Sequence, residues 1–148
     1  MSYMKTSLRS AGIWISDEYI LLESLADQEI WGIPGGSVKS GESVEHACIR
    51  EYLEETGLTV GCDRLAIIHE NFWNNEGLSI QEYCFYFTVT PADETDTRPV
   101  VIGIERHIQF HWHPLASLGG IDFVPQELIG YLTALPSGPV FVSSREEK

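Results

Sequence analysis

Residues 36–58 place three glutamates at helical spacing between two glycines. Residues three or four positions apart share one face of an α-helix, so Glu51, Glu54 and Glu55 form one cluster of carboxylates. Gly57 follows them as the expected left-handed C-cap. The cluster then lies at the negative end of the helix dipole, where acidic side chains are disfavoured. The segment therefore predicts a helix with negative charge concentrated in its last turns.

The charge on this helix requires a counterion. We expect the helix to run from Val44 to Thr56 with Ser43 as its N-cap. Arg50 is its only basic side chain, and it can pair with Glu54 at i+4 but cannot offset several carboxylates. Oxygen ligands without histidine or thiolate at matching spacing suit Mg²⁺ or Mn²⁺ rather than Zn²⁺ or copper. The residues predict a divalent metal site, and the alternative is a solvated acidic helix face.

The fixed residues of this segment resemble a known signature. The segment is similar to that of the Nudix hydrolase family, G-x5-E-x7-R-E-U-x-E-E-x-G-U, where U is a bulky apolar residue. Tyr52 fills the first U position and is a mild departure, because its hydroxyl needs a partner or solvent. The other defined positions are all matched, by Gly36, Glu42, Arg50, Glu51, Glu54, Glu55, Gly57 and Leu58. This resemblance favours the metal site over the solvated face.

The resemblance implies a role for each matched residue. Glu54 and Glu55 would be the principal metal ligands, and Glu51 would be either a ligand or the general base. Arg50 would orient the carboxylates, with Glu42 and Gly57 as scaffold. A backbone carbonyl of the glycine loop, at Gly36, could join the metal ligands. Family members also place an acidic ligand near a late strand, which here is Glu105, and plain solvation of Glu105 is an equal alternative.

The activity implied by the resemblance is hydrolysis of an acid anhydride. Water would attack phosphorus in the diphosphate linkage of a nucleoside diphosphate derivative, with Mg²⁺ or Mn²⁺ as cofactor. The alternative is a catalytically idle Nudix-like domain that binds a nucleotide as a sensor, but an idle domain need not keep all the carboxylates. Fold and signature do not distinguish nucleoside triphosphates, oxidised nucleotides, ADP-ribose, dinucleoside polyphosphates and nucleotide sugars.

Candidate substrate-binding residues lie in two β-rich segments. Phe72, Trp73 and Tyr83 could stack on a base, and Glu82 could accept a hydrogen bond from a base or ribose. The alternative is that these aromatic side chains belong to the core, where large rings usually lie. Trp73 is the strongest candidate because it is next to the Asn74-Asn75 turn.

Composition limits the class of partner. The net charge of −13 disfavours nucleic-acid polymers and anionic membranes, both of which select basic surfaces. Three unpaired cysteines, no signal peptide and no apolar stretch of membrane-spanning length lead us to expect a cytoplasmic protein. A small-molecule nucleotide is the expected partner, and a homodimer is left open.

The 148 residues are expected to form one domain over residues 1–148, with 136–148 as a polar C-terminal tail. Apolar patterning predicts strands and a second helix over Val124–Leu135. The expected strands are Leu8–Ser16, Tyr19–Glu23, Ile30–Ile33, Leu65–Trp73, Ile80–Thr90, Val100–Ile104 and Ile108–Trp112. This order gives an α/β class, a mixed β-sheet between helices, which is the α/β/α sandwich that the resemblance also implies.

Overall fold

A computed structural model describes residues 4–25, 28–93, 98–99, 101–104 and 107–145. Strands dominate it, with one long helix and several short helical turns. The strands are β1 (Met4–Ile13), β2 (Ile15–Ser16), β3 (Tyr19–Leu25), β4 (Gly35–Ser37), β5 (Val60–Asn75), β6 (Leu78–Pro91), β7 (Ile108–Pro114) and β8 (Val140–Arg145). The helices are α1 (Val44–Thr56) and α2 (Ile129–Thr133), with 3-10 turns η1 (Leu115–Gly120) and η2 (Gln126–Leu128).

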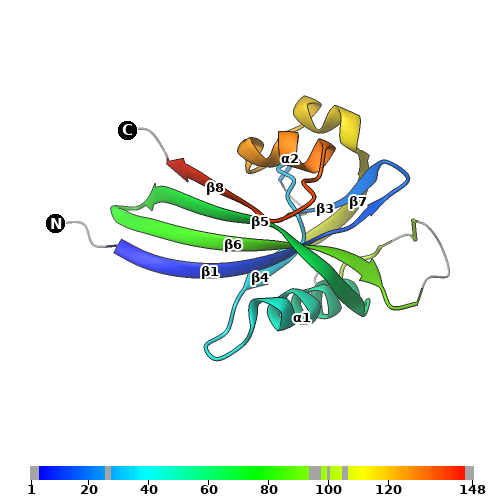
Figure 1. The fold of residues 1–148 in the computed structure, drawn as a ribbon, viewed down its shortest axis with the longest axis horizontal. Helices are drawn as coiled ribbons and strands as arrows, with labels where there is room; N and C mark the ends of the chain where they lie inside the picture. The colour runs from blue at the N-terminus through cyan, green and yellow to red at the C-terminus, as the bar shows by residue number, and fades with distance from the viewer. Residues whose placement is uncertain (1–3, 26–27, 94–97, 100, 105–106, 146–148) are drawn as a thin grey trace.

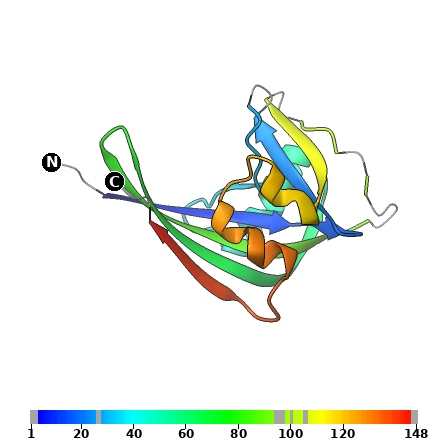
Figure 2. The ribbon, with the colours of Figure 1, turned by 90° about the horizontal axis from the view of Figure 1, so that it is seen from above.

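The strands form two sheets. The larger sheet has the order β4-β1-β6-β5-β8 and is mixed, because β1 is parallel to β6 and β8 is parallel to β5 while β5 and β6 form an antiparallel hairpin. The smaller sheet, β2-β3-β7, is antiparallel. Helix α1 lies on one side of the larger sheet, and α2 lies on the other (Figures 1 and 2). The mixed sheet with helices on both sides confirms the predicted α/β class.

Two hydrophobic cores hold these layers together. One lies between the sheets and the short helices, and includes Ile20, Tyr86, Phe123 and Leu132. The other lies under α1 and includes Trp14, Leu21, Cys48, Tyr52 and Phe87. Because β3 contributes Leu21 to one core and Leu22 to the other, the smaller sheet is fixed against both layers.

Helix α1 has the predicted ends. The Ser43 side chain accepts a hydrogen bond from the His46 amide at 3.1 Å, and Gly57 closes the helix with φ 77°. The Tyr52 hydroxyl, at the departure from the family signature, is fully buried and donates to the Gly12 carbonyl at 2.7 Å. A Cβ at Gly12 would lie 2.5 Å from the Tyr52 ring, so helix and sheet approach closely here. The buried hydroxyl is satisfied, and it fixes α1 on β1.

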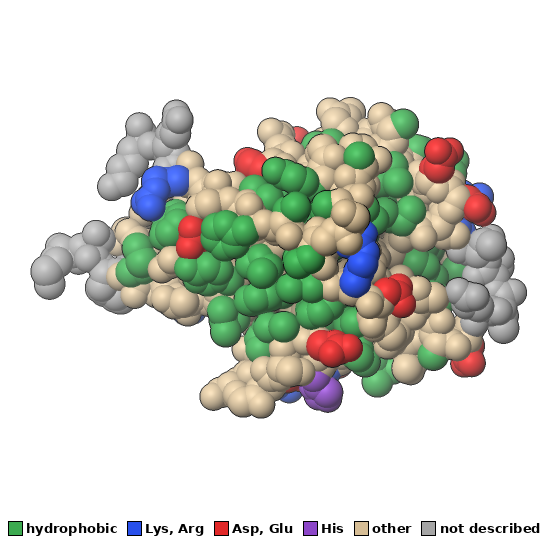
Figure 3. All heavy atoms as spheres, in the orientation of Figure 1, with side chains coloured by type: hydrophobic (Ala, Val, Ile, Leu, Met, Phe, Trp, Pro, Cys, Tyr) green, Lys and Arg blue, Asp and Glu red, His purple; other side chains and the backbone are tan. Residues whose placement is uncertain are grey.

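Part of the larger sheet projects beyond α1. Figure 3 shows hydrophobic side chains gathered over this uncovered face. By strand register Leu8, Tyr83 and Phe85 share it with Phe141 of β8. Leu8 is 44% exposed and Phe141 is 60% exposed.

Several predicted elements differ from the observed ones. The tail prediction for residues 136–148 is wrong at Val140–Arg145, because the alternation of Val140, Phe141 and Val142 pairs as β8 on the edge strand β5. Residues 30–33 make only isolated bridges, and 101–104 form no strand. The second helix is shorter than predicted, starting as a 3-10 turn after Pro125. Among the described residues, no helix is long and apolar enough to cross a membrane.

Candidate metal and substrate site

The glycine loop brings backbone directly against the acidic face of α1. In β4, Gly35 pairs with Ala11 and Gly36 pairs with Ser10. A Cβ at Gly36 would lie 2.5 Å from Oε1 of Glu51 and 2.6 Å from Oε2, so only glycine allows this carboxylate to pack on the loop. The structure therefore brings two predicted site residues, Gly36 and Glu51, into contact.

Arg50 organises the carboxylates around it. Its guanidinium donates to Glu42 twice, from Nε at 2.7 Å and from Nη2 at 2.9 Å. Nη1 donates to Glu51 at 3.0 Å and to Glu54 at 3.1 Å, and Nη2 also donates to the Ser37 carbonyl at 3.0 Å. One planar fork thus fixes three acidic side chains relative to β4, which a lysine could not do.

Glu42 is the scaffold carboxylate of this network. It also accepts from the Lys39 amide at 3.1 Å, and its Oε2 lies 2.8 Å from Nδ1 of His46. The hydrogen bonds from Arg50, above all, hold the pKa of the Glu42 carboxyl far below its usual range. Glu42 is therefore ionised throughout the neutral range, and its role in positioning Arg50 does not depend on pH there.

Glu55 differs from the other glutamates of the helix. It is only 6% exposed, and it faces Glu23 of β3. Burial, followed by the neighbouring Glu23 and Glu51 carboxyls, raises the pKa of Glu55 to about 11. Burial also raises the pKa of Glu23. In the absence of a cation, the pair therefore keeps a proton at neutral pH.

The carboxylate oxygens of Glu51, Glu54 and Glu55 are of the kind that binds a hard divalent cation, but they do not converge on one point. Within the described part of the chain, no three or more His, Cys, Asp or Glu side chains converge as a metal centre. Arg50 engages one oxygen each of Glu51 and Glu54. Oε2 of Glu55 is buried without a hydrogen-bond partner. A carboxylate cluster with an orphaned buried oxygen matches the all-oxygen ligands that Mg²⁺ and Mn²⁺ prefer.

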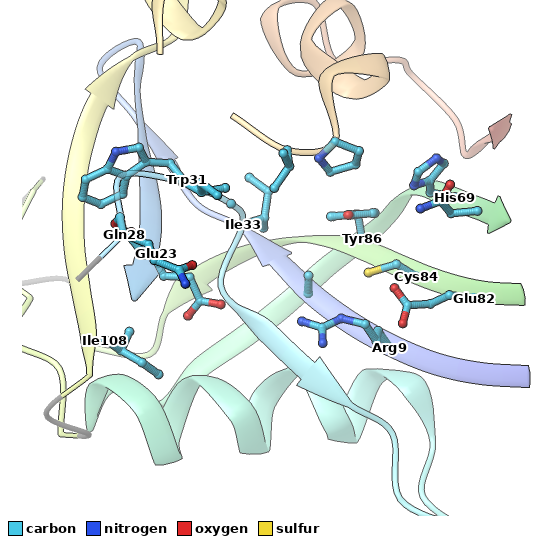
Figure 4. A pocket seen from close by; sticks show the side chains of 17 residues that line it. Arg9, Glu23, Gln28, Trp31, Ile33, His69, Glu82, Cys84, Tyr86 and Ile108 are labelled. Atoms are coloured by element: carbon cyan, nitrogen blue, oxygen red, sulfur yellow. Dashed lines mark hydrogen bonds between the residues drawn. The ribbon is translucent and has the colours of Figure 1, made fainter. Parts of the chain in front are cut away.

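A cavity of about 430 Å³ is lined in part by Glu23, the neighbour of Glu55. Figure 4 shows Glu23 at one end of it and His69 with Glu82 toward the other, with Arg9 between them. Polar and apolar side chains both line the cavity, among them Trp31, Ile33, Asn71, Cys84 and Tyr86. This volume and mixed lining are typical of a small-molecule site.

The predicted substrate residues lie on opposite faces of the larger sheet, because successive residues of a strand point to opposite sides. Glu82 and Asn71 are paired in register and line the cavity. Tyr83 and Phe72 belong to the opposite face, where the Tyr83 hydroxyl donates to Glu70 and Arg145 stacks over Phe72 at 4.1 Å. Trp73 is half-buried near the hairpin end and is not among the cavity-lining residues. Of the four, the structure brings only Glu82 to the cavity.

One predicted ligand and one missed residue remain. Glu105 lies outside the described residues. Glu23 was not singled out by sequence reasoning, although a signal was present: it is an acidic residue directly after Ile20, Leu21 and Leu22. Its approach to Glu55 of α1 joins distant parts of the chain, which local patterning does not reveal.

Known proteins with similar sequences or folds indicate the family of this chain. The uncharacterized Nudix hydrolase YvcI of Bacillus subtilis (strain 168) is 31% identical over 74% of this chain and 67% of its own length. Diphosphoinositol polyphosphate phosphohydrolase 3-alpha of Mus musculus is 32% identical over 61% of this chain and 53% of its own length. For a further Bacillus subtilis relative the match spans only 27% of each protein.

Solved structures share the fold across most of the chain. The mutator MutT protein of Bacillus halodurans superposes with a TM-score of 0.76, at 19% identity, covering 94% of this chain and 89% of that one. The family model described as NUDIX domain matches residues 6–131. With most of its length matched in this way, the chain belongs to the NUDIX domain family.

Proposed function

We propose that this protein is a divalent-cation-dependent hydrolase that cleaves a diphosphate linkage in a nucleoside diphosphate derivative. The observation that carries the proposal is the meeting of three features: the Glu51 carboxylate against Gly36, the buried unpartnered oxygen of Glu55, and the cavity that begins at Glu23. Carboxylates beside a small-molecule cavity are the arrangement that metal-assisted phosphoryl chemistry requires. A matching fold alone would not support this function.

Each group of the site has a separate task. Glu51, Glu54 and Glu55 would hold Mg²⁺ or Mn²⁺, which when bound neutralises phosphate oxygens and makes water more acidic. Arg50 positions Glu51 and Glu54 through its fork, and Glu42 holds Arg50. The cavity would bind the rest of the substrate and keep bulk water from it. The general base would be one of these glutamates. Glu51 is our first choice because the glycine loop fixes its carboxylate, and Glu54 and Glu55 would then be the principal ligands.

The names of similar proteins refer to several different substrates, so the first experiment should test a panel of substrates. Among them are a diphosphoinositol polyphosphate phosphohydrolase and an ADP-ribose pyrophosphatase, so related sites serve different substrates. A phosphate-release assay should therefore cover nucleoside triphosphates with normal and oxidised bases, ADP-ribose, dinucleoside polyphosphates, nucleotide sugars and diphosphoinositol polyphosphates. Added phosphatase and product chromatography would identify the bond that is broken.

We expect turnover of at least one of these substrates with Mg²⁺ or Mn²⁺, and loss of turnover in excess chelator. The reason is that phosphoryl transfer depends on neutralising the charge of the phosphate oxygens. The described site offers mainly carboxylates, which are themselves negative, so a bound cation must supply the positive charge. Full activity in chelator would refute the proposal. Tight binding of a nucleotide with no turnover under any metal would instead support a sensor domain.

We expect Glu82→Gln to raise KM by roughly tenfold or more for the best nucleotide, because a hydrogen bond to a charged group contributes about 1.5–3 kcal/mol. Its carboxylate faces the cavity, and its one assigned bond, from the Ser7 hydroxyl, is long at 3.3 Å. Trp73→Ala is the matched comparison, since Trp73 does not line the cavity. A KM that changes for Trp73→Ala but not for Glu82→Gln would place the base at the hairpin end instead.

Two further aspects of the protein remain proposals. We propose a cytoplasmic location, which the three free cysteines support, because thiols stay reduced there.

We also propose a homodimer that covers the apolar sheet face around Leu8 and Phe141, since monomers rarely expose large apolar patches. Sedimentation analysis of the wild type and of Phe141→Ser would test the dimer, and a monomeric wild type would refute it.

A further inference from the structure

Glu23 is an acidic side chain in a setting where charge is costly. It follows Leu21 and Leu22 of β3, both of which are fully buried. Its backbone is fixed by two hydrogen bonds with Gly32, at 2.8 and 3.0 Å. The Gly35 amide also donates a hydrogen bond to its carboxyl group. The side chain is therefore held between the glycine loop and the cavity.

The carboxyls of Glu23 and Glu55 can hydrogen-bond to each other while one of them is protonated. Once both are ionised, Oε2 of each is buried without a hydrogen-bond donor among the described residues, as free ligand oxygens would be. Such atoms are rare in folded proteins, because a buried polar atom left unsatisfied destabilises the fold. Burying two acidic groups side by side from different elements adds to this cost. Arg50 cannot compensate, because it is fully bonded to other acceptors. Arg9 lowers the pKa of Glu23 through its charge, but burial outweighs it and the pKa of Glu23 stays raised.

The position of Glu23 also connects two parts of the site. It is the carboxylate that both faces Glu55 of α1 and lines the cavity, where it forms one end (Figure 4). A cation held there would lie between Glu55 of α1 and the cavity. Arg9, in the middle of the cavity, would then face the same anionic group.

We propose that Glu23 is an additional ligand of the divalent cation, outside the 36–58 segment, and that it places the cation at the end of the cavity. This inference rests on the proposed function, because it assumes that Glu55 binds the same ion. It identifies which end of the cavity receives the diphosphate, and it leaves the end at Glu82 for the remainder of the substrate.

The test is Mn²⁺ affinity, measured on full-length protein by the electron paramagnetic resonance signal of free Mn²⁺. Glu23→Gln keeps the shape and removes the charge, and Glu23→Asp keeps the charge and withdraws the oxygens by one methylene. The matched control is Glu29→Gln, which makes the same charge change on an exposed residue of the following loop. Circular dichroism melts in chelator would show which variants are folded.

We expect Glu23→Gln and Glu23→Asp each to weaken Mn²⁺ binding at least tenfold, and Glu29→Gln to stay within twofold of the wild type. In chelator, Glu23→Gln should melt no lower than the wild type, because its amide can donate to Glu55. Unchanged Mn²⁺ affinity in a folded Glu23 variant would overturn the inference and leave the proposed function intact. If the wild type itself binds no Mn²⁺, the proposed function fails as well.

Discussion

Glu54→Gln should lower kcat by at least about a hundredfold, because it removes a charge that would hold the cation in the transition state. The loss should come with little loss of folding stability. The Glu54 side chain is 48% exposed, and its described ion pair is the i,i+4 contact with Arg50 at 3.1 Å. Exposed helix pairs of this kind contribute only about 0.3–0.5 kcal/mol. Kinetics and a thermal melt on the same sample would check both parts.

Glu45→Gln is the control for this prediction. Glu45 is exposed in the first turn of the same helix, and it makes no side-chain contact with the carboxylate cluster that we describe. We expect its kcat to match the wild type. If Glu54→Gln retained full activity with a normal response to Mg²⁺, Glu54 would be a solvated helix residue and the ligand set would have to be drawn from Glu51, Glu55 and Glu23.

The sequence predicted the bounds and the caps of α1 correctly, because their signals are local. Caps at Ser43 and Gly57, and glutamates at i,i+3 and i,i+4 spacing, depend only on neighbours in the chain. The family signature also includes Gly36 and Glu51, the two residues that fit closely against each other in the structure. The mixed sheet was predicted from strands flanked by two helices.

The features that sequence reasoning missed depend on long-range pairing. Whether Glu82 or Tyr83 faces the cavity is decided by the register of β5 on β6, which has bulges between Cys62 and Ile67. Strand β8 forms only because β5 offers a parallel edge. Glu23 and Glu55 meet between β3 and α1, which are distant in the chain. None of these relationships has a signature in the local pattern.

The acidity of Glu55 predicts how stability should depend on pH when cations are removed. Its ordinary pKa is 4.5, and burial beside Glu23 raises it to about 11. Between these values the folded chain keeps a proton that the unfolded chain has released. The native state therefore binds more protons, and the free energy of unfolding must fall as pH rises. The slope is about 1.4 kcal/mol per pH unit for one such group.

In chelator, the wild type should lose about 3 kcal/mol of stability between pH 6.5 and pH 8.5 relative to Glu55→Gln, whose amide does not titrate. The comparison with Glu55→Gln removes the contributions of other shifted groups, such as the buried His69 and the cysteines. Chemical denaturation of both proteins at each pH would measure the difference. Parallel curves for the two proteins would show that Glu55 is already ionised in the fold.

Added Mg²⁺ should remove this pH dependence in the wild type. A cation that binds the ionised carboxylate competes with the proton, so its affinity should rise with pH while the protein loses its intrinsic stability. At a hundred times its Kd, Mg²⁺ should stabilise the fold by about 2.7 kcal/mol, and Glu55→Gln should gain far less. The pH slope seen in chelator should therefore flatten in saturating Mg²⁺, because the ion replaces the proton between Glu55 and its acidic neighbours. A slope that is the same with and without Mg²⁺ would mean that the cation binds elsewhere and leaves this buried pair protonated.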